Sequence, residues 1–251
     1  MLTTQRKKAI LEALARDGQV LAKALAEAFA VSEDTVRRDL REMAGEGLLQ
    51  RVHGGALPAS PATADFAQRQ SIESEAKRAV AKAAAEMVGE GQVVIVDGGT
   101  TCVQLARYLP LTLRATVVTH SPSIAVELVD HPSIEVVVIG GRLFKHSIVT
   151  VGAAALEALS HIRADLFFMG VTGVHASAGF STGDLEEAYM KRALAAHAAE
   201  TVVLASSDKI NAASQYKIGE IAMASTIVVE RNTPAALTDP LAAAGVSIVR
   251  A

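Results

Sequence analysis

The chain has 251 residues, a formal net charge of −3 and a hydrophobic fraction of 50%. This apolar content is too high for a disordered chain, and the length allows one large domain or two unequal ones. The single cysteine, Cys102, excludes an intramolecular disulfide and a zinc site built from several thiolates. The longest apolar runs are strand-sized, far below the ~20 residues of a membrane span, and the first eight residues lack the apolar stretch of a signal peptide. We therefore expect a soluble cytoplasmic protein that does not enter a membrane.

The first 57 residues predict a small helical unit followed by a hairpin. Apolar side chains recur at helical spacing in residues 5–16 and 20–30, and a third helix is expected from the N-cap Ser32 to about residue 44. Residues 48–53 alternate weakly and end in Gly54-Gly55, which predicts a short hairpin. Two short helices joined by a tight turn form the helix-turn-helix geometry, although a plain three-helix bundle has a similar pattern.

Cations cluster in this unit, although a solvated helix face explains any one cluster on its own. In a helix-turn-helix the second helix enters the major groove, where its outward side chains contact bases and phosphates. Wing cations would lie near the backbone or the minor groove. The candidate DNA contacts are Ser32, Thr35, Arg37, Arg38, Arg41, Arg51 and His53.

Two segments carry a specific resemblance. Val31-Ser-Glu-Asp-Thr-Val-Arg-Arg-Asp-Leu40 and Glu46-Gly-Leu-Leu-Gln-Arg-Val-His-Gly-Gly-Ala56 closely resemble the winged helix-turn-helix of the DeoR family of bacterial transcriptional regulators. The resemblance implies that the first segment holds the recognition helix and that Thr35, Arg37 and Arg38 contact DNA. Asp39 has an alternative, structural role, in which it orients an arginine or satisfies the fold.

Residues 57–64 hold two prolines and small polar side chains without apolar periodicity, which is typical of a semi-rigid spacer. We place the domain boundary here. The expected organisation is a winged helix-turn-helix domain at 1–57, a linker at 58–71 and an effector-sensing domain at 72–251. Residues 66–70 and a helix over 72–88 would begin the second domain.

The second domain alternates predicted strands and helices. Strands are expected at 93–96, 115–119, 134–139, 164–170, 201–205, 227–229 and 246–249, and helices at 101–109, 121–129, 152–160 and 184–199. The first of these strands is continuously apolar, as in a strand buried on both faces. This alternation predicts an α/β fold with a doubly wound parallel sheet.

Ligands bind such sheets at the carboxyl ends of the strands. Here the segment Asp97-Gly98-Gly99-Thr100-Thr101 follows the first strand and opens a helix, which offers backbone N–H groups, hydroxyls and a helix N-terminus to a phosphate. Packing in a tight turn also explains such glycines. The loop is neither the dinucleotide fingerprint nor a Walker A loop, so a nucleotide cofactor is not expected.

The later strand ends and the segment 181–191 resemble the sensor domain of DeoR-type regulators. That domain is similar in fold to ribose-5-phosphate isomerase and to CoA-transferase-like proteins, and its usual effectors are phosphorylated sugars or related metabolites. The resemblance and the strand-end pattern give the candidate effector-binding residues, which are Asp97, Gly98, Gly99, Thr100, Thr101, His120, Ser121, Gly140, Gly141, Thr182, Glu187, Lys191, Asp208 and Lys209.

Several of these residues have plainer interpretations. Glu187 and Lys191 are spaced i,i+4 and would suit a surface pair, and Lys209 would suit a solvated loop. His120 stands where Asn is usual in the family, and Gly98 replaces a small residue. We favour a neutral, hydrogen-bonding His120 over a pH-sensitive group. Cys102 is expected to be a packing residue, and the scattered histidines predict no metal site.

Two functions compete. The first is a DNA-binding regulator, a repressor of a carbohydrate metabolism operon, whose operator binding is modulated by a phosphorylated sugar and which acts as a homo-oligomer, a dimer or a tetramer. The alternative is a phosphosugar isomerase-like enzyme with an accessory DNA-binding head. Its base would be among Asp97, Asp184, Glu186, Glu187 and Asp208, but no pattern singles one out, so we assign no catalytic residue and expect no enzyme.

Overall fold

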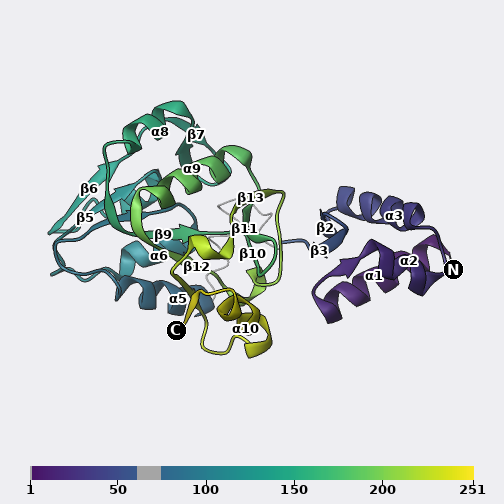
Figure 1. Ribbon diagram of the computed structural model, residues 1–251. Helices are drawn as coiled ribbons and strands as arrows, with labels where there is room; N and C mark the ends of the chain where they lie inside the picture. The colour runs from purple at the N-terminus through teal and green to yellow at the C-terminus, as the bar shows by residue number, and fades with distance from the viewer. Residues whose placement is uncertain (1, 61–74) are drawn as a thin grey trace.

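A computed structural model of the chain describes residues 2–60 and 75–251, which form two modules (Figure 1). The N-terminal module, or head, contains three helices and a small antiparallel sheet of strand order β1-β3-β2. Ile10, Val36, Leu40 and Met43 lie at its centre and are almost fully buried. Its elements are α1 (Thr3–Asp17), β1 (Val20–Leu21), α2 (Ala22–Phe29), α3 (Glu33–Gly45), β2 (Leu49–Val52) and β3 (Gly55–Pro58).

The local sequence explains how the head is built. Ser32 caps α3, because its Oγ accepts a hydrogen bond from the Thr35 amide at 3.2 Å. Gly55 allows β3 to lie against β1, because a Cβ at this position would stand 1.9 Å from the carbonyl oxygen of Val20. Two expectations need correction. The helix expected over 20–30 begins only at Ala22, after the short strand β1, and the wing hairpin continues to Pro58.

The larger module, or sensor, is built on a sheet of seven parallel strands in the order β15-β14-β12-β9-β4-β5-β6. These strands are β4 (Val93–Val96), β5 (Ala115–Thr119), β6 (Ile134–Val138), β9 (Ala164–Gly170), β12 (Ala198–Leu204), β14 (Thr226–Val229) and β15 (Ser247–Arg250). The helices are α5 (Glu75–Ala85), α6 (Thr100–Tyr108), α7 (Pro122–Glu127), α8 (Ala153–Leu159), α9 (Leu185–Ala196) and α10 (Ala235–Ala243).

Helices cover both faces of this sheet. Val94 and Val96 pack with α5, α6 and α7, whereas Ile95 points to the opposite face and packs with α8, α9 and α10. Val94, Ile95 and Val96 are fully buried, as the continuous apolar run predicts, and Val93 is partly buried. The expected α/β class with a parallel, doubly wound sheet is therefore confirmed.

Several short elements were not predicted. They are the hairpin β7 (Arg142–Phe144) and β8 (Val149–Val151), the small antiparallel sheet of β10 (Gly173–His175), β11 (Gly179–Thr182) and β13 (Tyr216–Gly219), and α10. The helix expected over 184–199 is too long, because Ala198 already belongs to β12. The elements expected at 66–70 and 72–74 lie outside the described residues. None of the helices within residues 2–60 and 75–251 is long and apolar enough to cross a membrane.

Strand order locates the place where a ligand site can form. The chain runs from β4 to β5 and β6 on one side, and then from β9 to β12, β14 and β15 on the other. The connections therefore reverse direction between β4 and β9. In open α/β sheets a crevice forms at such a switch point, outside the carboxyl ends of the strands.

Candidate ligand site and nucleic-acid interface

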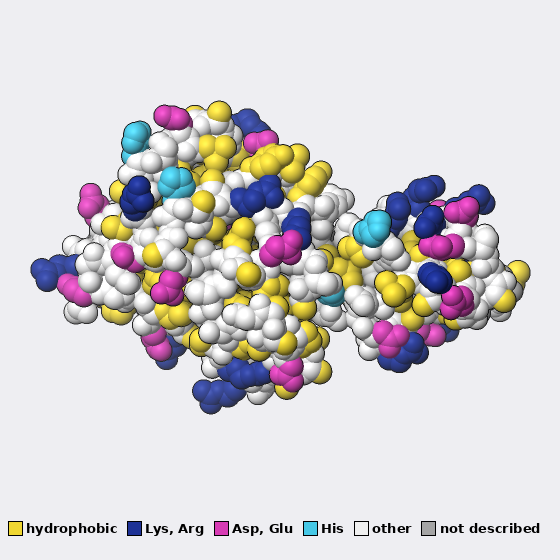
Figure 2. Space-filling view, in the orientation of Figure 1, with side chains coloured by type: hydrophobic (Ala, Val, Ile, Leu, Met, Phe, Trp, Pro, Cys, Tyr) yellow, Lys and Arg dark blue, Asp and Glu magenta, His cyan; other side chains and the backbone are white. Residues whose placement is uncertain are grey.

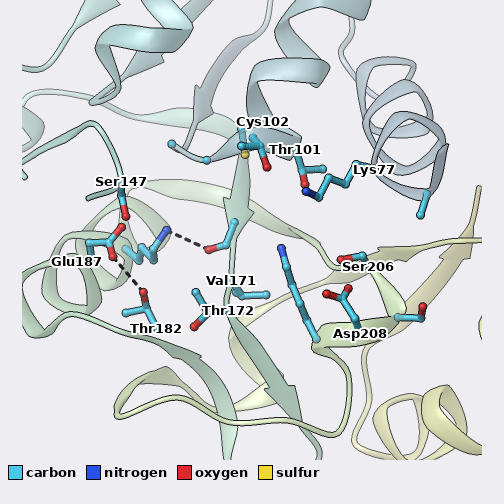
Figure 3. A pocket seen from close by; sticks show the side chains of 18 of the residues that line it. Lys77, Thr101, Cys102, Ser147, Val171, Thr172, Thr182, Glu187, Ser206 and Asp208 are labelled. Carbon is cyan, nitrogen blue, oxygen red and sulfur yellow. Dashed lines mark hydrogen bonds between the residues drawn. The ribbon is translucent and has the colours of Figure 1, made fainter. Parts of the chain in front are cut away.

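A cavity of about 420 Å³ lies at this switch point. Figure 3 shows Ser147, Thr182 and Glu187 on one side of the cavity, and Ser206 and Asp208 on the other. Of the candidate effector residues, those that line it are Gly98, Gly99, Thr100, Thr101, Thr182, Glu187, Lys191, Asp208 and Lys209. The topology thus brings together residues more than one hundred positions apart.

The loop after β4 forms one wall of the cavity. Gly99 precedes α6 with a φ of 102°, in the region that favours glycine, and Thr100 and Thr101 form the first turn of the helix. Gly98 lies directly against the β7–β8 hairpin, since a Cβ there would stand 2.2 Å from Cγ1 of Val149. The loop therefore keeps its path because it carries no side chain at Gly98.

Asp97 lies behind this loop and is fully buried. Its Oδ1 accepts a hydrogen bond from the Gly98 amide at 2.8 Å and lies 2.8 Å from Nε2 of His120. Its Oδ2 accepts from the Gly170 amide at 2.8 Å and from Nζ of Lys191. Burial alone would raise the pKa of Asp97, but Lys191 and His120 outweigh it and lower the pKa to about 2. Asp97 is thus an ionised carboxylate that organises the cavity floor.

Lys191 and Glu187 come from successive turns of α9 and face the cavity. They are 5% and 6% exposed, which is incompatible with a surface ion pair. Nζ of Lys191 also donates to the carbonyl oxygen of Gly170 at 3.0 Å, and Thr182 Oγ1 donates to Glu187 at 3.2 Å (Figure 3). Burial opposes the charge of Lys191, but the carboxylates of Asp97 and Glu187 raise its pKa overall. Lys191 therefore presents a positive charge beside a carboxylate.

Some candidate residues lie elsewhere. His120 and Ser121 are fully buried behind the wall, and Ser121 Oγ donates to the carbonyl oxygen of Ile148 at 3.1 Å. Gly140 and Gly141 are exposed at the turn into β7 and are not among the described residues that line the cavity. Cys102 lines the cavity, but burial and then the Asp97 carboxylate raise the pKa of its thiol. This supports the packing interpretation of the cysteine.

The list of candidate effector residues omits further lining residues. Among them are Lys77 on α5, Ser147 in the β7–β8 turn, Thr172 after β9, Ser206 and Ser207 after β12, and Glu230 after β14. The rule that ligands bind at strand carboxyl ends could have found Thr172, Ser206 and Glu230. Lys77 and Ser147 carried no signal, because neither lies at the end of a predicted strand. No group of three or more potential metal ligands occurs in the part of the chain that the structure describes.

The head presents a mixed charged surface along α3 (Figure 2). Arg38, Arg41, Arg51 and His53 are exposed and form no ion pair with any described residue. Arg37 instead pairs with Glu33 at 2.7 Å on the same helix. The candidate nucleic-acid contacts Ser32 and Thr35 lie at the start of α3, where their hydroxyl oxygens are 2.8 Å apart. This arrangement leaves guanidinium groups open on one side of the helix expected to enter the major groove.

Two family models match the chain. The model described as the DeoR-like helix-turn-helix domain matches residues 6–62, and that described as the DeoR C-terminal sensor domain matches residues 72–231. The chain belongs to the DeoR family. It is therefore a DNA-binding transcriptional regulator, and the resemblance found in the sequence is confirmed.

Curated relatives match this DeoR-family chain over nearly its whole length. The HTH-type transcriptional regulator GlpR of Haloferax volcanii is 32% identical over 99% of this chain and 98% of its own. A putative aga operon transcriptional repressor of Escherichia coli O157:H7 is 30% identical over 98% and 93%. The glycerol-3-phosphate regulon repressor of Escherichia coli K12 is 28% identical over 96% of each chain.

Among solved structures, ribose 5-phosphate isomerase A from Methanocaldococcus jannaschii matches 53% of this chain and 52% of its own, with a TM-score of 0.40 and 20% identity.

Proposed function

We propose that this DeoR-family protein represses a carbohydrate metabolism operon, and that a phosphorylated sugar or related metabolite modulates its operator affinity. The observation that carries the proposal is the cavity at the β4–β9 switch point. Its loop wall offers the N-terminus of α6 and two threonine hydroxyls, and Lys77 and Lys209 line the same cavity. Helix N-termini and lysines are suited to bind a phosphate.

The opposite part of the cavity suits a polyol. Glu187 offers a carboxylate oxygen, Thr182 a hydroxyl, and Lys191 an ammonium group, all within a largely buried wall. Sugar hydroxyls both donate and accept hydrogen bonds, so a wall with both kinds of partner matches them. The name of one relative agrees with this ligand class, since it is a glycerol-3-phosphate regulon repressor.

A direct connection between the cavity wall and the head supports the regulatory role. Ser60, just after the wing, donates through Oγ to the carbonyl oxygen of the cavity-lining Thr172 at 2.5 Å. The Ser60 amide donates to the carbonyl oxygen of Ala213, and the Ala213 amide donates to that of Pro58, both at 3.2 Å. We infer that a ligand which displaces Thr172 also moves the anchor of the head.

A second cavity, of about 440 Å³, lies where the head meets the sensor. Leu49 and Gln50 of the head line it, together with Phe144 and Gln215 of the sensor. Ser147, Thr172 and Glu187 line both cavities. These three residues thus separate the effector cavity from the second cavity, which borders the head. Regulation also requires that the ligand bind one arrangement of the head better than the other.

We further propose that the site binds its ligand without turnover. An isomerase needs a carboxylate base beside the reacting C–H bond. Asp97 is fully buried and surrounded by four hydrogen-bonding partners, and Asp184 accepts a hydrogen bond from the Glu187 amide at the start of α9. Of the five carboxylates considered, Glu187 and Asp208 line the cavity. Conversion of ribose 5-phosphate by the purified protein, abolished by Glu187→Gln, would contradict the proposal.

Operator recognition by winged heads suggests a cytoplasmic homo-oligomer, a dimer or a tetramer, that places two heads on two half-sites.

The test of the function is fluorescence anisotropy on labelled DNA from upstream of the protein's own operon. It is run at fixed salt, with sugar phosphates added one at a time. We expect one compound to shift the binding curve.

Lys209→Gln should abolish this shift while leaving DNA affinity unchanged. Lys217→Gln is the matched control, because Lys217 is exposed on β13 and pairs with Glu220. Tight DNA binding that no compound alters would refute the effector site. Absence of specific DNA binding on every upstream fragment would refute the repressor.

A further inference from the structure

His120 is a buried side chain whose two ring nitrogens both face hydrogen-bond acceptors. Its Nδ1 lies 2.9 Å from the carbonyl oxygen of Thr150, and its Nε2 lies 2.8 Å from Oδ1 of Asp97. The His120 and Asp97 side chains are both fully buried, so water does not replace either contact. The protonation state of the ring therefore has to satisfy these two neighbours.

The first neighbour fixes one proton. A carbonyl oxygen can only accept, so Nδ1 has to donate to Thr150. The second neighbour, the Asp97 carboxylate, also acts as an acceptor. Its other partners, which come from Gly98, Gly170 and Lys191, are all donors. Asp97 is thus ionised and cannot donate to the ring. Nε2 has to carry a proton as well, and a neutral imidazole has only one N–H.

The charged and titratable groups around the ring are compatible with a positive charge on His120. The Asp97 and Cys102 side chains approach from the loop after β4 and the start of α6, and Lys191 and Glu187 belong to α9. Cys102 stays a thiol, because burial and the Asp97 carboxylate raise its pKa. Lys145 and His146, in the β7–β8 turn, are exposed. Asp97 is the direct ionic partner of both Lys191 and His120.

We propose that His120 is an imidazolium that acts as a positioning residue for the effector site. It fixes the Asp97 carboxylate, and through it the ammonium group of Lys191, and it adds a second positive charge beneath the loop of Gly98 and Gly99. Asp97 then faces two cations, so the cluster of Asp97, Lys191 and His120 carries a net positive charge. An asparagine at this position would leave it neutral. This proposal replaces the neutral histidine favoured from the sequence.

The protonation state is testable without any ligand. Long-range proton–nitrogen correlation spectra of the full-length protein at pH 7 should show both His120 nitrogens protonated, and the signals should vanish in His120→Asn. His131 is an internal reference, because its Nδ1 accepts two backbone N–H groups and therefore carries no proton of its own. One unprotonated nitrogen on His120 would overturn the proposal. If His120→Asn does not fold, single variants of the other six histidines assign the signals by elimination.

The effect on anion binding rests on the proposed function and is tested with inorganic sulfate, whose charge is constant near neutral pH. We expect His120→Asn to weaken sulfate binding about fivefold, as the loss of one nearby unit charge implies. His131→Asn, at the amino end of β6, should leave it unchanged. Equal affinity in wild type and His120→Asn would overturn the role of the charge. If wild type does not bind sulfate, the effector site itself is contradicted, while the spectra still decide the state of His120.

Discussion

Arg6 on α1 and Asp39 on α3 form a buried, two-pronged ion pair in the head. Nε of Arg6 lies 2.7 Å from Oδ2 of Asp39, and Nη2 lies 3.1 Å from Oδ1. Their side chains are only 8% and 4% exposed. Of the two roles considered for Asp39, the structure supports the structural one, because this carboxylate ties the helix proposed to read DNA to the first helix of the domain.

Loss of this pair should destabilise the head. Asp39→Ala leaves the Arg6 guanidinium buried without its carboxylate, which costs about 3–5 kcal/mol in comparable pairs. Chemical denaturation followed by circular dichroism should show a destabilised helical transition, together with lost operator binding. Asp34→Ala is the control, because Asp34 lies on the same helix with its side chain 90% exposed. A head of unchanged stability in Asp39→Ala would refute the structural role.

Arg38→Ala should weaken operator binding without affecting the fold. The side chain is exposed on α3 and forms no ion pair among the described residues, so its removal breaks no such pair. If it contacts a guanine, the loss is about 1–3 kcal/mol and specificity relaxes at that base pair, whereas a phosphate contact would reduce the salt dependence instead. Anisotropy titrations at several salt concentrations distinguish the two. Arg16→Ala should bind as wild type, because Arg16 pairs with Asp17 at the far end of α1.

Gly98→Ala should disturb the cavity by displacing the β7–β8 hairpin. The new Cβ would stand 2.2 Å from Cγ1 of the buried Val149, and overpacking of this kind costs about 1–3 kcal/mol. Adding Val149→Ala should recover part of the loss, so that the double variant is more stable than the sum of the single effects. Thermal unfolding of the four proteins measures the coupling. Gly140→Ala is the control, because no atom lies within 4 Å of its added Cβ; strictly additive effects would contradict the steric explanation.

The Asp97 cluster should make the sensor sensitive to acid. The pKa of Asp97 is lowered from 3.8 to about 2 in the folded protein, so its stabilising contribution is complete above its unfolded pKa and is lost as the pH falls towards 2. Asp97→Asn leaves Lys191 and His120 facing an uncharged amide and should cost about 3–5 kcal/mol at pH 7. Denaturation at pH 7, 4 and 2.5 should show the difference from wild type shrinking with acid. A constant difference would mean that Asp97 is not ionised in the folded state.

The strands of the large sheet could be predicted because buried parallel strands consist of continuous runs of apolar residues. β4, β5 and β9 have the expected boundaries. The β7–β8 hairpin could not be found in this way, since its strands have three residues each and Arg142 and Leu143 are exposed. The end of α9 was misplaced because alanines on both sides of His197 carry no boundary signal.

The position of the cavity could be predicted from the sequence, but which side chains face it and which lie buried behind it could not. Spacing placed Asp97 in a phosphate loop, whereas its carboxylate turns inward, towards His120 just after β5 and Lys191 on α9, which only the folded chain brings near. The sequence left Glu187 and Lys191 open to a surface interpretation, because i,i+4 spacing does not show which helix face is buried. In the head, the structural role of Asp39 could not be assigned from the sequence. It depends on the ion pair with Arg6, which lies thirty-three positions away along the chain.

The contacts that join the wing to the sensor also bear on how much free energy is needed to move the head. Among the described residues, they include the two backbone hydrogen bonds between residues 58–60 and Ala213, the Ser60 hydroxyl on Thr172, and the Asn211 side chain against Gly18. Each hydrogen bond contributes about 1 kcal/mol net. Ligands in coupled systems typically shift equilibria by about 1–3 kcal/mol. These hydrogen bonds are thus of the same order of free energy as the coupling that a bound ligand supplies, so we infer that ligand binding at the cavity can loosen the attachment of the head.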